Sequence, residues 1–227
     1  MRPLESIDPT SGERRARFAE LGASELEARL SHAAAAQREW ACLTPAVRAP
    51  LLVALAGALR ARAEELALLL AAEMGKPLTQ GRAEVEKCAA ACEHYAAHGP
   101  QALADEPVAL PRPGAREWVA YRPLGLVLAI MPWNFPLWQV VRCAAPTLLA
   151  GNGILLKHAE NVQGCATALE ELFGAAGFAP GLFTNLALTQ PRLPALIEDE
   201  RVAAVTLTGS TRAGRAVAAL AGEALKK

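Results

Sequence analysis

The sequence predicts an α/β fold: a parallel sheet with flanking helices, preceded by N-terminal helices and a β-hairpin. Two patterns support this prediction. Before residue 105, apolar residues recur at helical spacing. After residue 124, short apolar runs alternate with helical segments, as in strands joined by right-handed crossovers. A chain of 227 residues can bury a core of this kind without a disulfide or a metal.

Start and stop signals predict three helices in the first part of the chain. Ser24 and Glu27 have the spacing of a capping box, in which a hydroxyl and a carboxylate bond each other's neighbouring amides. Gly75 and Pro77 stop the second helix, and Thr79 is expected to cap the third. The expected helices cover 24–42, 45–75 and 79–97.

The sequence pattern changes after residue 105, from helical spacing to short apolar runs. Two short runs, 108–110 and 117–121, flank a Pro-Arg-Pro-Gly turn and are typical of a hairpin with exposed edges, which we expect to serve association. The later strands are expected at 126–130, 154–157, 182–186 and 203–207, with helices at 138–150, 163–175, 191–199 and from 211 onward.

Composition excludes several classes of protein. The 23 basic residues balance 23 acidic ones, so no net field favours nucleic acid. The N-terminus carries charges where a signal peptide has an apolar segment, and no apolar run is long enough to span a membrane. We therefore expect a cytoplasmic protein with no nucleic-acid or membrane partner.

Neither the cysteines nor the histidines predict a metal site. The 5 cysteines show no Cys-x-x-Cys spacing, so reduced, buried thiols are expected. His94 and His98 lie one helical turn apart, but two histidines without a third ligand are more often exposed side chains.

Polar residues follow three of the predicted strands, where ligands bind in a parallel sheet. Asn134, held between two prolines, can donate an amide N–H to an oxyanion or can simply shape a turn. Lys157 and Glu160 suit ribose hydroxyls, although an ion pair in a solvated loop has the same pattern. Gly209 and Ser210 precede a helix start that can face a pyrophosphate, or Ser210 is an ordinary N-cap.

Three motifs in this order, MPWNFP, LLKHAE and LTGSTRAG, resemble the aldehyde dehydrogenase superfamily. The similarity extends to Glu73-Met-Gly-Lys-Pro77 and to most of the chain, and the short stretch 183–201 is most like bacterial succinate-semialdehyde dehydrogenases. The resemblance implies a Rossmann-like NAD(P)-binding domain. It divides the chain into an N-terminal helical part of the cofactor-binding domain (1–105), the hairpin of a bridging or oligomerisation region (106–123) and an incomplete cofactor-binding domain (124–227).

The resemblance also implies roles for single residues. Asn134 would hold the oxyanion during aldehyde oxidation, and Arg142 would bind the substrate carboxylate unless it is an ordinary surface arginine. The residues expected to bind the cofactor are Met131, Pro132, Trp133, Lys157, Glu160, Gly209 and Ser210. Because a carboxylate at Glu160 would repel a 2′-phosphate, NAD is favoured over NADP, which stays possible.

In the family, the general base of a Glu-Leu-Gly-Gly motif and the nucleophilic cysteine would follow the position of Lys227. We therefore expect a truncated homologue that is inactive alone, within a homo-oligomeric family that oxidises aldehydes. Two alternatives stay open. The chain is a non-catalytic homologue that binds NAD or a full-length relative, or a complementary chain supplies the second half.

Overall fold

The computed structural model describes residues 4–109 and 116–227. Its centre is a parallel sheet of four strands in the order β7-β6-β5-β8. The strands are β5 (Leu126–Met131), β6 (Gly153–His158), β7 (Phe183–Asn185) and β8 (Val202–Leu207). The predicted α/β fold with a parallel sheet is thus confirmed.

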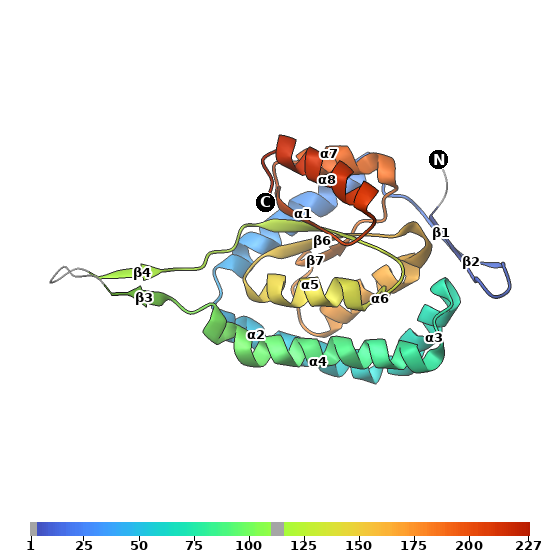
Figure 1. The fold of residues 1–227 in the computed structure, drawn as a ribbon, viewed down its shortest axis with the longest axis horizontal. Helices are drawn as coiled ribbons and strands as arrows, with labels where there is room; N and C mark the ends of the chain where they lie inside the picture. The colour runs from blue at the N-terminus through green and yellow to red at the C-terminus, as the bar shows by residue number, and fades with distance from the viewer. Residues whose placement is uncertain (1–3, 110–115) are drawn as a thin grey trace.

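Helices cover both faces of the sheet (Figure 1). Leu126 and Leu128 of β5 point into a core shared with α1, α7 and α8, whereas Val127 and Ala129 point into a larger core shared with α2 to α6. Alternate side chains of a strand face opposite sides, so a central strand buried on both faces is apolar throughout. The helices are α1 (Ala23–Ala41), α2 (Pro45–Ala61), α3 (Ala63–Met74), α4 (Leu78–Ala102), α5 (Trp138–Leu149), α6 (Gln163–Ala175), α7 (Leu193–Glu198) and α8 (Thr211–Glu223).

Two hairpins lie outside the sheet. The predicted one pairs β3 (Glu106–Val108) with β4 (Glu117–Val119) and projects from the body as an arm, while its predicted turn falls outside the described residues (Figure 1). The other, β1 (Leu4–Ile7) with β2 (Arg14–Phe18), was not predicted from the sequence. The usable sequence signal for this hairpin was Gly12, because glycine readily adopts the positive φ of +73° that ends the turn between the two strands.

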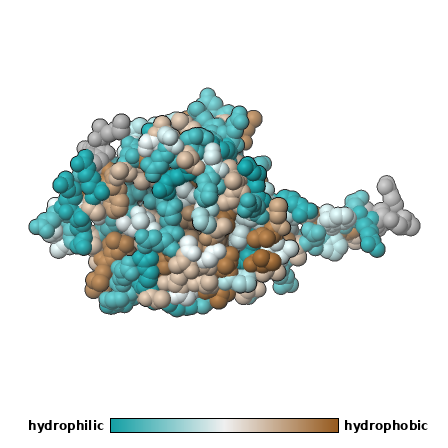
Figure 2. All heavy atoms as spheres, turned by 180° about the vertical axis from the view of Figure 1, so that it is seen from behind, coloured by the Kyte–Doolittle hydropathy of each residue, from teal (hydrophilic) through white to brown (hydrophobic). Residues whose placement is uncertain are grey.

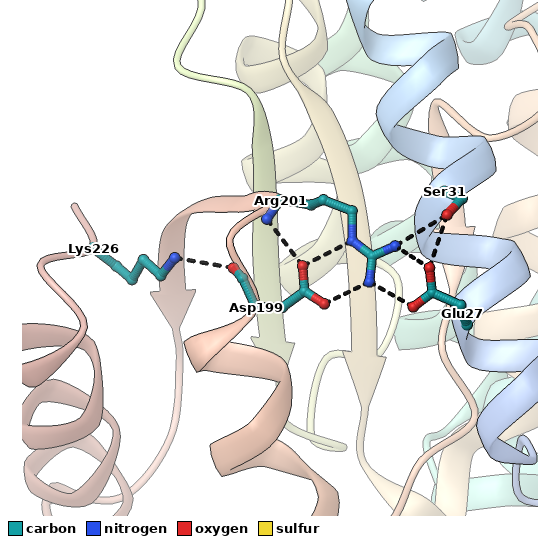
Figure 3. Close-up of polar contacts among 5 residues, drawn as sticks. All are labelled: Glu27, Ser31, Asp199, Arg201 and Lys226. Atoms are coloured by element: carbon teal, nitrogen blue, oxygen red, sulfur yellow. Dashed lines mark hydrogen bonds and ion pairs between the residues drawn. The ribbon is translucent and has the colours of Figure 1, made fainter.

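The predicted capping box of the first helix is wrong. Gly22 is the N-cap of α1, so Ser24 lies inside the first turn. The carboxylate of Glu27 instead accepts from Arg201 at 2.6 and 2.8 Å, and Arg201 also binds Asp199 (Figure 3). Both oxygens of the Glu27 carboxylate bind the Arg201 guanidinium, so a residue 174 positions away, and not the start of the helix, provides its charged partner.

The second predicted helix is two helices. The chain turns at Arg62, which ends α2 and begins α3, and its guanidinium binds Glu65 of α3 and Glu171 of α6. This turn lets α3 leave the axis of α2 and pack on α6. The third helix begins at Leu78 after Pro77, so Thr79 does not cap it.

The surface is mixed in character (Figure 2). Exposed apolar side chains include Val47 and Val53 on α2, Leu68 on α3, and Trp118 with Val119 on the hairpin arm. Among the described residues, no helix combines the length and hydropathy that crossing a bilayer requires.

Candidate functional site

A cleft of about 650 Å³ lies at the carboxyl ends of β5, β6 and β8. Strand ends of a parallel sheet converge on one edge, which brings together segments distant in sequence. Six of the seven residues expected to bind a cofactor line this cleft: Met131, Pro132, Trp133, Lys157, Gly209 and Ser210. The three polar strand ends singled out in the sequence therefore surround a single cleft.

The two charged residues at the end of β6, Lys157 in the strand and Glu160 just after it, are arranged differently. Lys157 lines the cleft with a side chain that is only 5% exposed, and burial lowers its pKa while the carboxylates of Glu160 and Glu20 oppose this shift. Glu160 is half-buried and does not line the cleft. Its carboxylate lies 4.0 Å from the Lys157 ammonium and accepts from the backbone N–H of Gln190.

The segment after β8 enters α8 at the cleft. Ser210 is the N-cap of α8, and its hydroxyl accepts from the N–H of Ala213 at 3.2 Å. The capping interpretation of Ser210 is therefore correct for its side chain. The remaining free amides of the first turn still make the start of α8 suitable for an anion. Arg212, which the sequence analysis did not single out, adds a cation to the cleft lining.

One wall of the cleft is apolar and was not predicted. It is formed by α7 and α8, which contribute Leu193, Pro194, Ala213, Ala216, Val217 and Leu220. The spacing of the α8 residues, three or four apart, marks one face of a helix and was a usable signal. A flat apolar wall beside polar strand ends suits a ligand with an aromatic ring and a charged or hydroxylated tail.

Asn134 is exposed and follows Trp133, which is the last residue of its loop that lines the cleft. The loop between β5 and α5 rests on His158, a fully buried side chain of β6. The N–H of Ala159 donates to His158 Nδ1 at 2.9 Å, which leaves Nε2–H to donate to the carbonyl of Pro136, also at 2.9 Å. A neutral imidazole satisfies both contacts.

His158 predicts a dependence of stability on pH. Burial lowers its pKa to about 4 from an ordinary 6.5. Between these values the unfolded chain binds a proton that the folded chain does not. The free energy of unfolding should therefore fall by up to about 3 kcal/mol as the pH drops from about 6.5 to about 4. Urea unfolding of wild type and His158→Gln over this range measures the effect, and parallel pH curves for the two proteins would contradict it.

Arg142, on α5, borders a second cavity of about 530 Å³. Its exposed guanidinium donates to the hydroxyl of Thr208 at 3.1 Å. Met131, Leu207 and Thr208 line both this cavity and the cleft, so the two adjoin at the ends of β5 and β8. Arg142 and the residues expected to bind the cofactor thus lie near the same edge of the sheet.

The sequence model of the aldehyde dehydrogenase family matches residues 1–227. The chain belongs to the aldehyde dehydrogenase family. The resemblance noted from three motifs is thereby confirmed, and it covers the whole chain.

Individual relatives in the family narrow the comparison. The chain is 49% identical over 222 residues to an NAD(P)+-dependent succinate semialdehyde dehydrogenase of Escherichia coli K12, covering 98% of this chain and 48% of the relative. It is 43% identical over 226 residues to an NADP+-dependent succinate-semialdehyde dehydrogenase of Mycobacterium avium strain 104. That match covers 99% of this chain and 48% of the relative. The chain spans about half the length of these curated relatives.

A solved structure confirms the fold. The succinic semialdehyde dehydrogenase of Streptococcus pyogenes, crystallised with NADP+, superposes with a TM-score of 0.94 at 32% identity. The match covers 98% of this chain and 49% of that one. The Rossmann-like arrangement expected from the resemblance is therefore that of the family.

Three of the 5 cysteines are buried thiols unsuited to nucleophilic chemistry. All 5 are free thiols; Cys88, Cys92 and Cys165 are buried as expected, whereas Cys42 is exposed and Cys143 half-buried. Burial raises the pKa of Cys92 to about 12 and the pKa values of Cys88 and Cys165 well above normal. A thiol with a raised pKa forms little thiolate, which is the reactive species.

The rings of the two histidines one turn apart, His94 and His98, contact each other at a tilt of 31° with centroids 4.5 Å apart, and Nδ1 of His98 lies 2.9 Å from the His94 carbonyl. Within the described ranges, no three His, Cys, Asp or Glu side chains gather as metal ligands.

Proposed function

We propose that this chain forms the cofactor cleft and contributes the oxyanion-binding asparagine of an NAD-dependent dehydrogenase that oxidises succinic semialdehyde to the carboxylic acid. One observation carries the proposal: six predicted cofactor residues from three separate strand ends line one cleft. The names of the relatives support the substrate and a nicotinamide cofactor.

The cleft offers a complementary group for each part of NAD. Adenine would lie against the apolar wall of α7 and α8, and Lys157 with Glu160 would bind its ribose hydroxyls. The start of α8 at Gly209 and Ser210 would receive the pyrophosphate. Met131, Pro132 and Trp133 would line the groove toward the nicotinamide, which accepts the hydride when the cofactor is bound.

Asn134 would donate its side-chain amide to the oxyanion that forms when a nucleophile adds to the aldehyde carbon. The nucleophilic thiolate and the general base of the family's reaction are assigned to no residue of this chain. Arg142 would bind the distal carboxylate of the substrate, because an exposed guanidinium beside a cavity is a bidentate carboxylate receptor.

We also propose the division into residues 1–105, 106–123 and 124–227, with the hairpin arm as the contact of a homo-oligomer. The arm projects from the body and exposes Trp118 and Tyr121, at 57% and 46% (Figure 1). Exposed aromatic side chains are enriched where protein surfaces meet.

Purification of the protein from its own cells tests the function. Its intact mass is compared with 23.9 kDa, and the product is titrated calorimetrically with NAD and assayed for NADH formation from succinic semialdehyde. NAD binding with aldehyde oxidation supports the proposal. NAD binding without oxidation favours a non-catalytic nucleotide-binding protein, and no heat with millimolar NAD overturns the assignment of the cleft.

The choice between cofactors should depend on Glu160. In the wild type, its carboxylate would accept from the ribose hydroxyls of NAD and repel the 2′-phosphate of NADP. The variant Glu160→Ser should therefore weaken NAD and strengthen NADP, changing the ratio of the two Kd values by roughly tenfold or more, the effect of one charged hydrogen bond. The same titrations on Glu198→Ser, which alters an exposed carboxylate of α7 that borders a different cavity, serve as the control. An unchanged ratio would remove Glu160 from the cofactor site.

A further inference from the structure

Three side chains that do not line the cleft hold the loop that carries Asn134. His158 supports its exit at Pro136, as described above. Lys76, between α3 and α4, donates from Nζ to the backbone carbonyl of Asn134 at 3.1 Å. Glu84 of α4 accepts from the N–H groups of Leu137 and Trp138, each at 2.9 Å. The backbone from the carbonyl of the asparagine to the start of α5 is thus bonded to side chains from other elements.

Lys76 and Glu84 also bind each other. The ammonium and the carboxylate form a hydrogen-bonded ion pair with side chains only 4% and 1% exposed. The ammonium additionally lies 3.8 Å from the ring centroid of Phe135, the residue after Asn134. Among the described residues, the hydrogen bonds that the Lys76 and Glu84 side chains make to other residues all go to the loop or to the start of α5.

A buried ion pair contributes little net stability to a protein. Taking two charges out of water is costly, and well-packed apolar residues of similar volume often stabilise a protein as much or more. Unlike apolar residues, the pair makes directional hydrogen bonds to the backbone. Lys76 donates to one carbonyl, and Glu84 accepts from two amides. The carboxylate also lies at the N-terminus of α5, where the helix dipole favours negative charge.

We infer that Lys76 and Glu84 are positioning residues that fix the loop backbone so that the Asn134 amide meets the oxyanion. The inference rests on the proposed function of Asn134. Lys76 sets the orientation of the peptide group after Asn134, and Glu84 fixes the point at which the loop becomes helix. Their charges cancel, so the pair orders the loop without placing a net charge beside the developing oxyanion. Preorganised donors of this kind need no rearrangement during the reaction.

The test is the double variant Lys76→Met/Glu84→Gln in the protein as its own cells make it. The change leaves no unpaired charge, and the new side-chain amide at position 84 keeps an acceptor for the two backbone N–H groups. The matched control is Arg82→Met/Glu64→Gln, which makes the same kind of change in an exposed pair that also links α3 and α4. Three quantities are measured: kcat for aldehyde oxidation, the Kd for NAD, and hydrogen exchange of peptides spanning 131–140.

We expect kcat to fall by about ten- to a hundredfold, the effect of a small misplacement of a reacting group, with the Kd for NAD unchanged. Exchange in the loop should accelerate in the double variant and not in the control. A general loss of structure would instead weaken NAD binding and accelerate exchange everywhere, which would overturn the positioning role. Unchanged kcat and unchanged loop exchange would overturn it too.

A second variant covers the case in which the double variant does not fold. Glu84→Asp keeps the charge that pairs with Lys76 but shortens the side chain by one methylene, so its carboxylate should no longer reach both backbone N–H groups and exchange of the Leu137 and Trp138 amides should accelerate. Hydrogen exchange does not depend on activity. A wild type that neither binds NAD nor oxidises aldehyde would therefore refute the proposed function, whereas unaltered loop exchange in Glu84→Asp would refute this inference.

Discussion

Replacing Asn134 with alanine is expected to lower kcat for aldehyde oxidation by roughly a hundred- to a thousandfold, the cost of removing one oxyanion donor. The side chain is exposed beside the cofactor cleft, so its loss should leave the core and the Kd for NAD unchanged. The measurement is steady-state kinetics with succinic semialdehyde, together with calorimetric titration of NAD.

The variant Asn134→Asp sharpens this experiment. It keeps the shape of the side chain but replaces an N–H donor with a carboxylate that repels an oxyanion, so its kcat should be as low as that of Asn134→Ala or lower. Phe135→Leu, which changes an exposed neighbour in the same loop, is the control for general damage. Normal kcat in both Asn134 variants would show that the residue only shapes the turn.

Replacing Arg48 with methionine should give the largest loss of stability. This arginine is buried, and its guanidinium donates to carbonyls at the ends of two helices: Trp40, Ala41 and Leu43 at the end of α1, and Leu149 at the end of α5. A cation is favoured at helix C-termini, where carbonyls lack partners. Because several buried acceptors would lose their donors, the free energy of unfolding should fall by about 3 kcal/mol or more.

Urea denaturation measures this loss against two comparisons. Arg38→Met changes an exposed arginine in the last turn of α1 and should shift stability by no more than about 0.5 kcal/mol. Arg48→Lys keeps the charge but not the planar guanidinium with its several donors. Its loss of stability should therefore lie between those of Arg48→Met and Arg38→Met. Equal midpoints for Arg48→Met and Arg38→Met would show that water or rearrangement satisfies the carbonyls.

The guanidinium of Arg48 also explains why a glycine lies at position 151. Gly151 has φ of +92°, and a Cβ there would lie 2.7 Å from Nη2 of Arg48. The turn between α5 and β6 therefore depends on a side chain of α2 as well as on its own residues.

The sequence by itself determined the alternation of strands and helices after residue 124, because apolar runs bounded by Gly and Pro reflect local burial and local turns. It also indicated that three strand ends meet at one cleft, since parallel strands all end at the same edge, but it did not indicate the apolar wall of α7 and α8. Lys157 and Ser210, which line the cleft, were singled out for that reason.

Only the tertiary structure decided the partners of the charged side chains. Glu27 has the spacing of a cap but binds Arg201, the chain turns at Arg62 where leucine spacing predicts one helix, and Lys76 with Glu84 holds a loop more than 50 residues away. Spacing along a chain reports which residues share a helix face or a turn. It does not report which distant carboxylate, carbonyl or amide lies within reach, because that distance exists only after the layers have packed.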